Sequence, residues 1–134
     1  MAGRTKDKRE PIIFRKSIPH GTTDVLQERI KADGTIEEMR VRFYPGQQKA
    51  LQVEVVVEHK GQQAEYLYTS PATGEKYLSG DDDYFVFPLT CEVEYDDFVK
   101  IRVVNTDATY DYDLAVDVLV DYYGGKNRVI GGVL

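Results

Sequence analysis

Few residues of this chain belong to the types that supply catalytic nucleophiles or bases, and they do not form a catalytic pattern. His20 lies in a Pro-His-Gly turn, and His59 follows a valine-rich segment. Cys91, the single cysteine, falls at an inward position of an alternating segment, which is typical of a small core residue. A nucleophile needs an adjacent base and an orienting group, and the sequence places neither beside a serine or this cysteine. We therefore predict that the protein is not an enzyme.

Clustered loop carboxylates are the second group that could do chemistry, because calcium binds several oxygen ligands. The sequence contains one run of three aspartates and one of two, but neither has the alternate spacing and the glycine of an EF-hand loop. Solvated loop charge is the competing interpretation. The sequence predicts no cofactor and leaves a calcium site at these loops as the open alternative. The candidate ligands are Asp81, Asp82, Asp83, Asp96 and Asp97.

The elements that must position these residues read as strands, because apolar and polar residues alternate along most of the chain. Segment 24–31 could also line a helix face, but the Asp-Gly pair after it favours a strand. We predict an all-β fold, an antiparallel β-sandwich of about seven or eight strands with jelly-roll or Greek-key topology and an extended N-terminal arm. The expected strands are 24–31, 39–43, 51–57, 64–69, 84–87, 91–95, 98–105 and 112–123.

Turn residues set the expected connections between these strands. Asp33-Gly34 predicts a tight hairpin, since this pair supplies positive φ angles. Pro88 predicts the end of strand 84–87, and residues 70–83, with a proline, two glycines and three aspartates, predict a loop. Cys91, Val93 and Tyr95 are expected to face inward.

The first sixteen residues, MAGRTKDKREPIIFRK, differ in composition from the rest. They carry six basic and two acidic side chains, a formal charge of +4, whereas the other 118 residues carry 11 basic and 21 acidic ones, a formal charge of −10. Ordering such a segment costs about 1–2 kcal/mol per residue in backbone entropy, which contacts with a surface must offset. That surface is either the chain's own acidic domain or a neighbouring copy. Complementary charge favours the neighbouring copy.

We accordingly divide the chain into an N-terminal basic and apolar arm (1–20), a β-sandwich domain (21–125) and a C-terminal apolar tail or edge strand (126–134). The arm is predicted to act through its charges and an apolar anchor, and the tail to make a second contact. The predicted interaction residues are Arg4, Lys6, Lys8, Arg9, Ile12, Ile13, Phe14, Arg15, Lys16, Val129, Ile130, Val133 and Leu134.

Composition restricts the remaining classes. Hydrophobic residues make up 42% and charged residues 30%, as in ordinary globular proteins. No apolar run is long enough for a membrane span, and no signal peptide is apparent. The net charge of −6 argues against nucleic-acid binding except through the arm.

The arm, the strand plan and the late pair FVKIRVVN…YDLAVDVLVDYY resemble small jelly-roll-like β-sandwich structural proteins of virus and phage virions, such as capsid decoration or cement proteins and small capsid proteins. This resemblance implies a non-enzymatic structural protein of a virion or similar symmetric assembly, tethered to neighbouring subunits through its arm. It also implies a homo-oligomer whose partners are other copies or a major capsid-type protein, made in the host cytoplasm and located in the virion.

The alternative is a carbohydrate- or receptor-binding β-sandwich, with calcium as its optional ion. Four tyrosines flank the aspartate loop and could form a platform for a sugar, because aromatic rings combine apolar area with a polar tip. They are Tyr66, Tyr68, Tyr77 and Tyr84.

Overall fold

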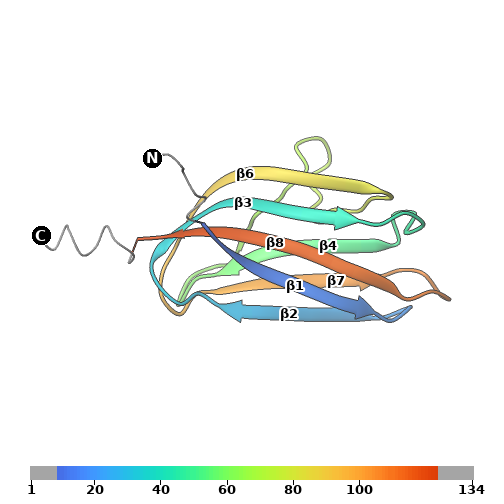
Figure 1. Cartoon of the computed structure of the whole chain (residues 1–134), viewed down its shortest axis with the longest axis horizontal. Helices are drawn as coiled ribbons and strands as arrows, with labels where there is room; N and C mark the ends of the chain where they lie inside the picture. The colour runs from blue at the N-terminus through green and yellow to red at the C-terminus, as the bar shows by residue number, and fades with distance from the viewer. Residues whose placement is uncertain (1–8, 124–134) are drawn as a thin grey trace, which may run out of the picture.

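The computed structural model describes residues 9–123, which fold into eight antiparallel strands arranged as two packed sheets (Figure 1). One sheet has the strand order β1-β8-β3-β6 and the other β2-β7-β4-β5. No helix that could cross a membrane occurs among residues 9–123. The strands are β1 (Glu10–Ile18), β2 (Thr23–Arg29), β3 (Gly34–Phe43), β4 (Leu51–Glu58), β5 (Glu65–Tyr66), β6 (Asp83–Val93), β7 (Phe98–Asn105) and β8 (Tyr112–Tyr122).

The strand order is that of a jelly roll. β1 pairs with β8, β2 with β7, β3 with β6 and β4 with β5, so the chain forms one long nested hairpin with β4 and β5 at its tip. Rolling this hairpin brings β3 beside β8 and β4 beside β7, which completes the two sheets. The prediction of an all-β sandwich with jelly-roll topology is confirmed.

Alternating side chains of the two sheets form the core between them. In β4 the residues at positions 51, 53, 55 and 57 are buried, and the residues between them are half-buried. β8 buries Leu114, Val116, Val118 and Val120 on the side predicted from its alternation. Phe43, at the end of β3, is among the largest fully buried side chains. The period-two pattern of the sequence therefore identifies most of the core.

Residues 10–18 are the main departure from the expected organisation. They do not extend away as an arm but form β1, which pairs along its whole length with β8, from Glu10↔Val120 to Ile18↔Tyr112. Ile12 and Phe14 are 6% and 4% exposed and belong to the core of their own sandwich. The sandwich therefore includes part of the segment assigned to the arm, and the expected boundary at residue 20 is wrong.

Gly34 has a different role from the one expected. β2 and β3 lie in different sheets, so Asp33-Gly34 does not close a hairpin, and Gly34 is not among the glycines with positive φ. A Cβ at Gly34 would lie 2.5 Å from the backbone oxygen of Asp121 on β8. The glycine permits close approach of two strands, which is the other common reason for a glycine in a sheet.

β6 also differs from its prediction. It runs unbroken through Pro88 from Asp83 to Val93, with an irregular register opposite Glu38 of β3. Proline is tolerated in edge strands and beside register irregularities, and Pro88 meets both conditions. Tyr95 was expected to face inward but lies beyond the strand and is 55% exposed. In segment 64–69, only Glu65 and Tyr66 form a strand.

Candidate functional sites

The outer face of the sheet β1-β8-β3-β6 carries a row of side chains that runs from one edge strand to the other. Sheet pairing aligns Ile13 of β1, Asp117 of β8, Arg40 of β3 and Val86 of β6. The ends of this row are apolar and open to solvent, since Ile13 is 55% and Val86 46% exposed. Tyr84, also on β6, is 56% exposed. The face thus has a charged centre with an apolar side chain at each edge.

Half of the six basic side chains predicted to tether the arm pair with acidic residues of the same chain. These ion pairs link residues 9–16 to their own domain and leave less of their charge for a neighbour. Arg4, Lys6 and Lys8 lie outside the described residues, as does the whole C-terminal tail with Val129, Ile130, Val133 and Leu134. The pairs are Arg9–Glu38 at 3.3 Å, Arg15–Asp117 at 2.7 Å and Lys16–Asp24 at 2.5 Å.

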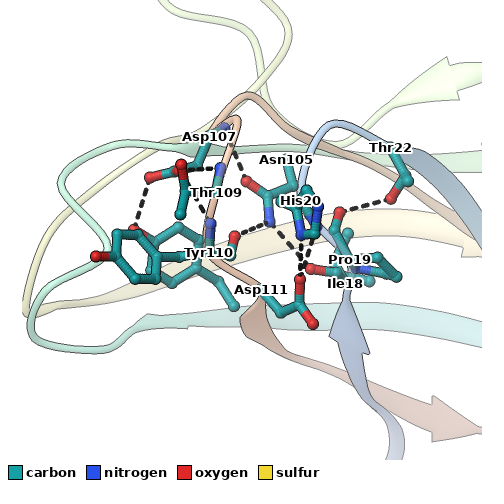
Figure 2. Close-up of polar contacts among 10 residues, drawn as sticks. Ile18, Pro19, His20, Thr22, Asn105, Asp107, Thr109, Tyr110 and Asp111 are labelled. Atoms are coloured by element: carbon teal, nitrogen blue, oxygen red, sulfur yellow. Dashed lines mark hydrogen bonds and ion pairs between the residues drawn. The ribbon is translucent and has the colours of Figure 1, made fainter.

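The loops at one end of the sandwich are joined by a buried asparagine (Figure 2). Asn105, at the end of β7, is 1% exposed. Its amide nitrogen donates to the carbonyl oxygens of Ile18 and Tyr110, both at 3.0 Å, and its amide oxygen accepts from the backbone N–H of Asp107 at 2.9 Å. One side chain thereby connects the β1–β2 loop to the β7–β8 loop.

Asp107 and Asp111 organise the rest of this end. Asp107 accepts hydrogen bonds from the backbone N–H groups of Thr109 and Tyr110 and from the hydroxyl of Tyr112, which lower the pKa of its carboxyl group. Asp111 contacts the ring of His20 at 2.8 Å, which lowers the pKa of Asp111. His20 therefore lies in a turn, as its Pro-His-Gly sequence predicted, and its contact with Asp111 links this turn to the β7–β8 loop.

Two of the four tyrosines expected to form a sugar platform share a pocket. Tyr68 and Tyr77 line a pocket of about 390 Å³ together with Phe85 and Phe87 of β6. The ring centroids of Tyr68 and Phe87 are 5.4 Å apart. Tyr66 and Tyr84 do not line this pocket. Its polar wall includes Ser70, Thr73, Glu75 and Ser79.

The aspartates proposed as calcium ligands each have contacts within the chain. Asp81 accepts from the backbone N–H of Gly46, Asp82 contacts Arg42, and Asp83 accepts from the backbone N–H of Asp81. These contacts stabilise the loop before β6. A calcium site at these loops stays a prediction.

The other two candidate calcium ligands, Asp96 and Asp97, differ in their contacts and burial. Asp96 is paired with Arg29 at 3.1 Å on the surface. Asp97, in contrast, is 1% exposed and accepts from the backbone N–H of Glu94 and from His59 Nδ1, both at 2.9 Å. Burial opposes ionisation of Asp97, but these hydrogen bonds outweigh it and hold its pKa below the ordinary value.

Asp97 belongs to a cluster that the sequence analysis missed. Its hydrogen bond to Nδ1 orients His59 so that the other ring nitrogen, Nε2, lies 3.1 Å from Glu65 Oε1. The thiol of Cys91 donates to the same oxygen at 3.5 Å. One ligand atom each from His59, Glu65 and Cys91 lies within 4.8 Å of the other two. His59 and Glu65 are six residues apart, but Cys91 is 26 residues from Glu65 and lies in the other sheet, so the sequence alone does not reveal the cluster.

The cluster is partly buried and lies among acidic side chains. Cys91 is 3% exposed, and burial followed by the charge of Glu65 raises the pKa of its thiol to about 12. Burial lowers the pKa of His59, but Asp97 and Glu65 together raise it above the ordinary value. A protonated thiol is a poor nucleophile, so this geometry does not supply the activated cysteine of a hydrolase.

No protein-family model and no curated protein sequence matches the chain. Among solved structures, it is similar to infectious bursal disease virus strain Gx, with 10% identity, a TM-score of 0.48, and coverage of 90% of this chain and 34% of the other. The VP2 subviral particle of that virus matches with 11% identity, a TM-score of 0.46, and coverage of 89% of this chain and 34% of the other. A serine protease of Aeromonas sobria matches with 8% identity, a TM-score of 0.42, and coverage of 88% of this chain and 28% of the other.

The chain thus spans about a third or less of the length of these structures. Two of them come from a virus. The class that the strand order defines is an eight-stranded jelly-roll β-sandwich.

Proposed function

We propose that the protein is a non-enzymatic structural subunit of a virion or similar symmetric assembly, in contact with its neighbours through its N-terminal segment and the outer face of the sheet β1-β8-β3-β6. The observation that carries this proposal is the exposure of Ile13, Tyr84 and Val86 on that face. Aromatic side chains such as Tyr84 are enriched in protein interfaces, and exposed apolar side chains gain free energy when a partner removes them from water.

The contact is made by side chains rather than by adding a strand to the sheet. Both edge strands of this sheet contain a proline, Pro11 in β1 and Pro88 in β6. Proline cannot donate a backbone hydrogen bond, and natural sheets use it to block edge-to-edge pairing. The sheet is therefore poorly suited to continuous pairing with another copy.

Deletion of residues 1–8 tests the role of the N-terminal segment. A deletion of residues 1–16 would remove most of β1, including the buried Ile12 and Phe14, and would confound assembly with folding. The shorter deletion leaves β1 intact. We expect the same circular dichroism spectrum and unfolding midpoint as for the full chain, but a lower assembled mass by light scattering.

A matched variant separates sequence from length in this experiment. Substitution of Arg4, Lys6 and Lys8 by glutamine keeps the segment but removes its basic charge, and should reduce assembly nearly as much as deletion. Full assembly of both variants would exclude the segment as a tether. A wild-type protein that is monomeric at all concentrations, alone and with a capsid-type partner, would refute the proposed function.

The pocket that Tyr68 and Tyr77 line favours a second candidate function, the binding of a carbohydrate. Aromatic walls with nearby hydroxyl and carboxylate groups suit sugar rings, which present both apolar faces and hydroxyls. Screening on a glycan array should then give ligands whose binding is lost in Tyr77→Ala and kept in Tyr84→Ala, since Tyr84 does not line the pocket. Absence of any glycan ligand would remove this candidate.

A further inference from the structure

We propose that His59, Glu65 and Cys91 form a binding site for a single zinc ion that joins the two sheets at their open edge. The cluster is distinct from the proposed assembly surface. Its ligand types, their mutual distances and the orientation of the histidine support the site.

The three ligand types together select zinc. Imidazole nitrogen, thiolate sulfur and carboxylate oxygen are the donors found in protein zinc sites, whereas calcium and magnesium prefer oxygen alone. Three protein ligands leave a fourth tetrahedral position for water.

Two of the three distances between ligand atoms are close to those of a tetrahedral site. Zinc bond lengths of about 2.0–2.3 Å and tetrahedral angles place a nitrogen and an oxygen ligand about 3.4 Å apart, and a sulfur ligand about 3.6 Å from either. In this structure His59 Nε2 lies 3.1 Å and Cys91 Sγ 3.5 Å from Glu65 Oε1. The third pair, His59 Nε2 and Cys91 Sγ, lies within 4.8 Å, and the two side chains adjust to the tetrahedral distance when the ion binds. The thiol proton leaves to solvent when sulfur binds the metal.

The histidine is held as zinc ligands usually are. In most metal sites the nitrogen of histidine that does not bind the metal donates to a carboxylate or carbonyl oxygen, which fixes the ring. Asp97 performs this task for His59 Nδ1 at 2.9 Å and is itself fixed by the backbone N–H groups of Glu94 and Lys60. The side chain of Glu65 is 52% exposed, so an ion can reach the cluster from solvent at this ligand.

The position of the cluster indicates what the ion would do. His59 follows β4 and Glu65 lies on β5, both in one sheet, whereas Cys91 lies on β6 at the edge of the other sheet. β5 has only two residues, so few hydrogen bonds close this edge of the sandwich. An ion bound by all three side chains fastens β5 and the β4–β5 loop to β6.

The test uses the full chain freed of metal with a chelator. Titration with Zn²⁺ in a calorimeter should give one ion per chain, and the same protein should show a higher unfolding midpoint with zinc than without. Co²⁺ in place of Zn²⁺ should give a thiolate-to-metal charge-transfer band and the strong visible absorption of a tetrahedral site. No stoichiometric binding, or cobalt binding without the charge-transfer band, would overturn the proposal.

Variants locate the site. His59→Gln, Glu65→Gln and Cys91→Ser should each weaken zinc binding at least about 10-fold, and Cys91→Ser should also abolish the charge-transfer band. Asp97→Asn should weaken binding about 10- to 100-fold while keeping that band, as expected of a positioning residue. His20→Gln is the matched control. His20 is the other histidine of the chain and contacts Asp111 instead of the cluster, so this variant should bind zinc as wild type does.

Glu65→Gln keeps the experiment decisive if a buried variant fails to fold. The side chain of Glu65 is 52% exposed, so its substitution leaves the core unchanged. Unchanged zinc affinity in a folded Glu65→Gln variant, together with loss in His20→Gln, would place any bound ion elsewhere and refute the assignment.

Discussion

At the scale of single residues, the polar side chains that the fold buries decide how its loops are held. Asn105 is 1% exposed and satisfies two carbonyl oxygens and one backbone N–H from two different loops. A buried polar group that loses its partner costs about 1–3 kcal/mol. Because three groups depend on this one side chain, Asn105 is the polar residue with the largest expected effect at this end of the sandwich.

Substitution Asn105→Ala should therefore lower the free energy of unfolding by about 2–4 kcal/mol, measured by urea denaturation at neutral pH. Thr109→Ala is the control in the same loop. Its backbone N–H to Asp107 is retained, so its effect should stay within about 0.5 kcal/mol. Equal effects of the two substitutions would show that the side-chain hydrogen bonds of Asn105 do not stabilise the fold.

The loops at this same end of the sandwich make the stability of the protein depend on pH. The carboxyl groups of Asp107 and Asp111 have pKa values below the ordinary value because backbone N–H groups and His20 donate to them. A carboxyl group whose pKa is lower in the folded state stabilises the protein above its unfolded pKa, and this contribution disappears as pH falls through the folded pKa. Stability should therefore decrease below about pH 4.

Asp107→Asn tests this dependence, because asparagine cannot ionise but can still accept the hydrogen bonds from the backbone. The variant should be less stable than wild type at pH 7 and should lose less stability between pH 5 and pH 3, as measured by urea denaturation at each pH. Parallel pH profiles for the two proteins would contradict the assignment.

The sequence identified the types of these residues but not their arrangement. A Pro-His-Gly turn predicted that His20 lies in a loop, and alternation predicted that Cys91 faces the core, which its burial confirms. Neither pattern could predict that Cys91 lies beside Glu65, because residues 64–69 read as a full strand and only two of them form one. Their contact depends on how the two sheets pack, because Glu65 lies on β5 and Cys91 on β6 of the other sheet.

At the scale of elements, β1 shows that charge composition is a poor guide to where a strand begins. Six basic residues and two acidic ones made residues 1–16 read as one arm that docks on a neighbouring copy. Yet Ile12, Phe14 and Ile18 fall on alternate positions of β1 and are all buried, with exposed Lys16 interrupting the pattern. The apolar run Pro11–Phe14 contained this signal. The expectation for Asp33-Gly34 was also wrong. An Asp-Gly pair often indicates a hairpin, but here Gly34 allows two strands to pack closely.

Neighbouring residues of β1 test whether it belongs to its own sandwich. Phe14→Ala removes a ring that is 4% exposed and should cost about 3–5 kcal/mol of unfolding free energy. Ile13→Ala, on the opposite face and 55% exposed, should change it by less than about 0.5 kcal/mol. Urea denaturation of both variants is sufficient. Similar small effects would mean that residues 10–18 form an arm after all.

At the scale of the whole molecule, the described ion pairs change how the charge asymmetry is interpreted. Arg9, Arg15 and Lys16 pair with carboxylates of the same chain and so help to hold β1 in place. Residues 1–8 carry three basic side chains and one acidic one, a formal +2, and the proposed contact with a neighbour would use this charge. The rest of the chain carries a formal −8.

This distribution predicts opposite salt effects for two forms of the protein. The Debye length falls from about 10 Å at 0.1 M salt to about 3 Å at 1 M. In the full chain, salt screens the attraction between the basic segment and a neighbouring acidic domain, so assembled mass measured by light scattering should decrease. Without residues 1–8, only repulsion between acidic domains is screened, so any residual association through Ile13, Tyr84 and Val86 should increase. Val86→Asp is the control that should weaken association at every salt concentration. If salt affects both forms in the same direction, the basic segment does not act through its charge.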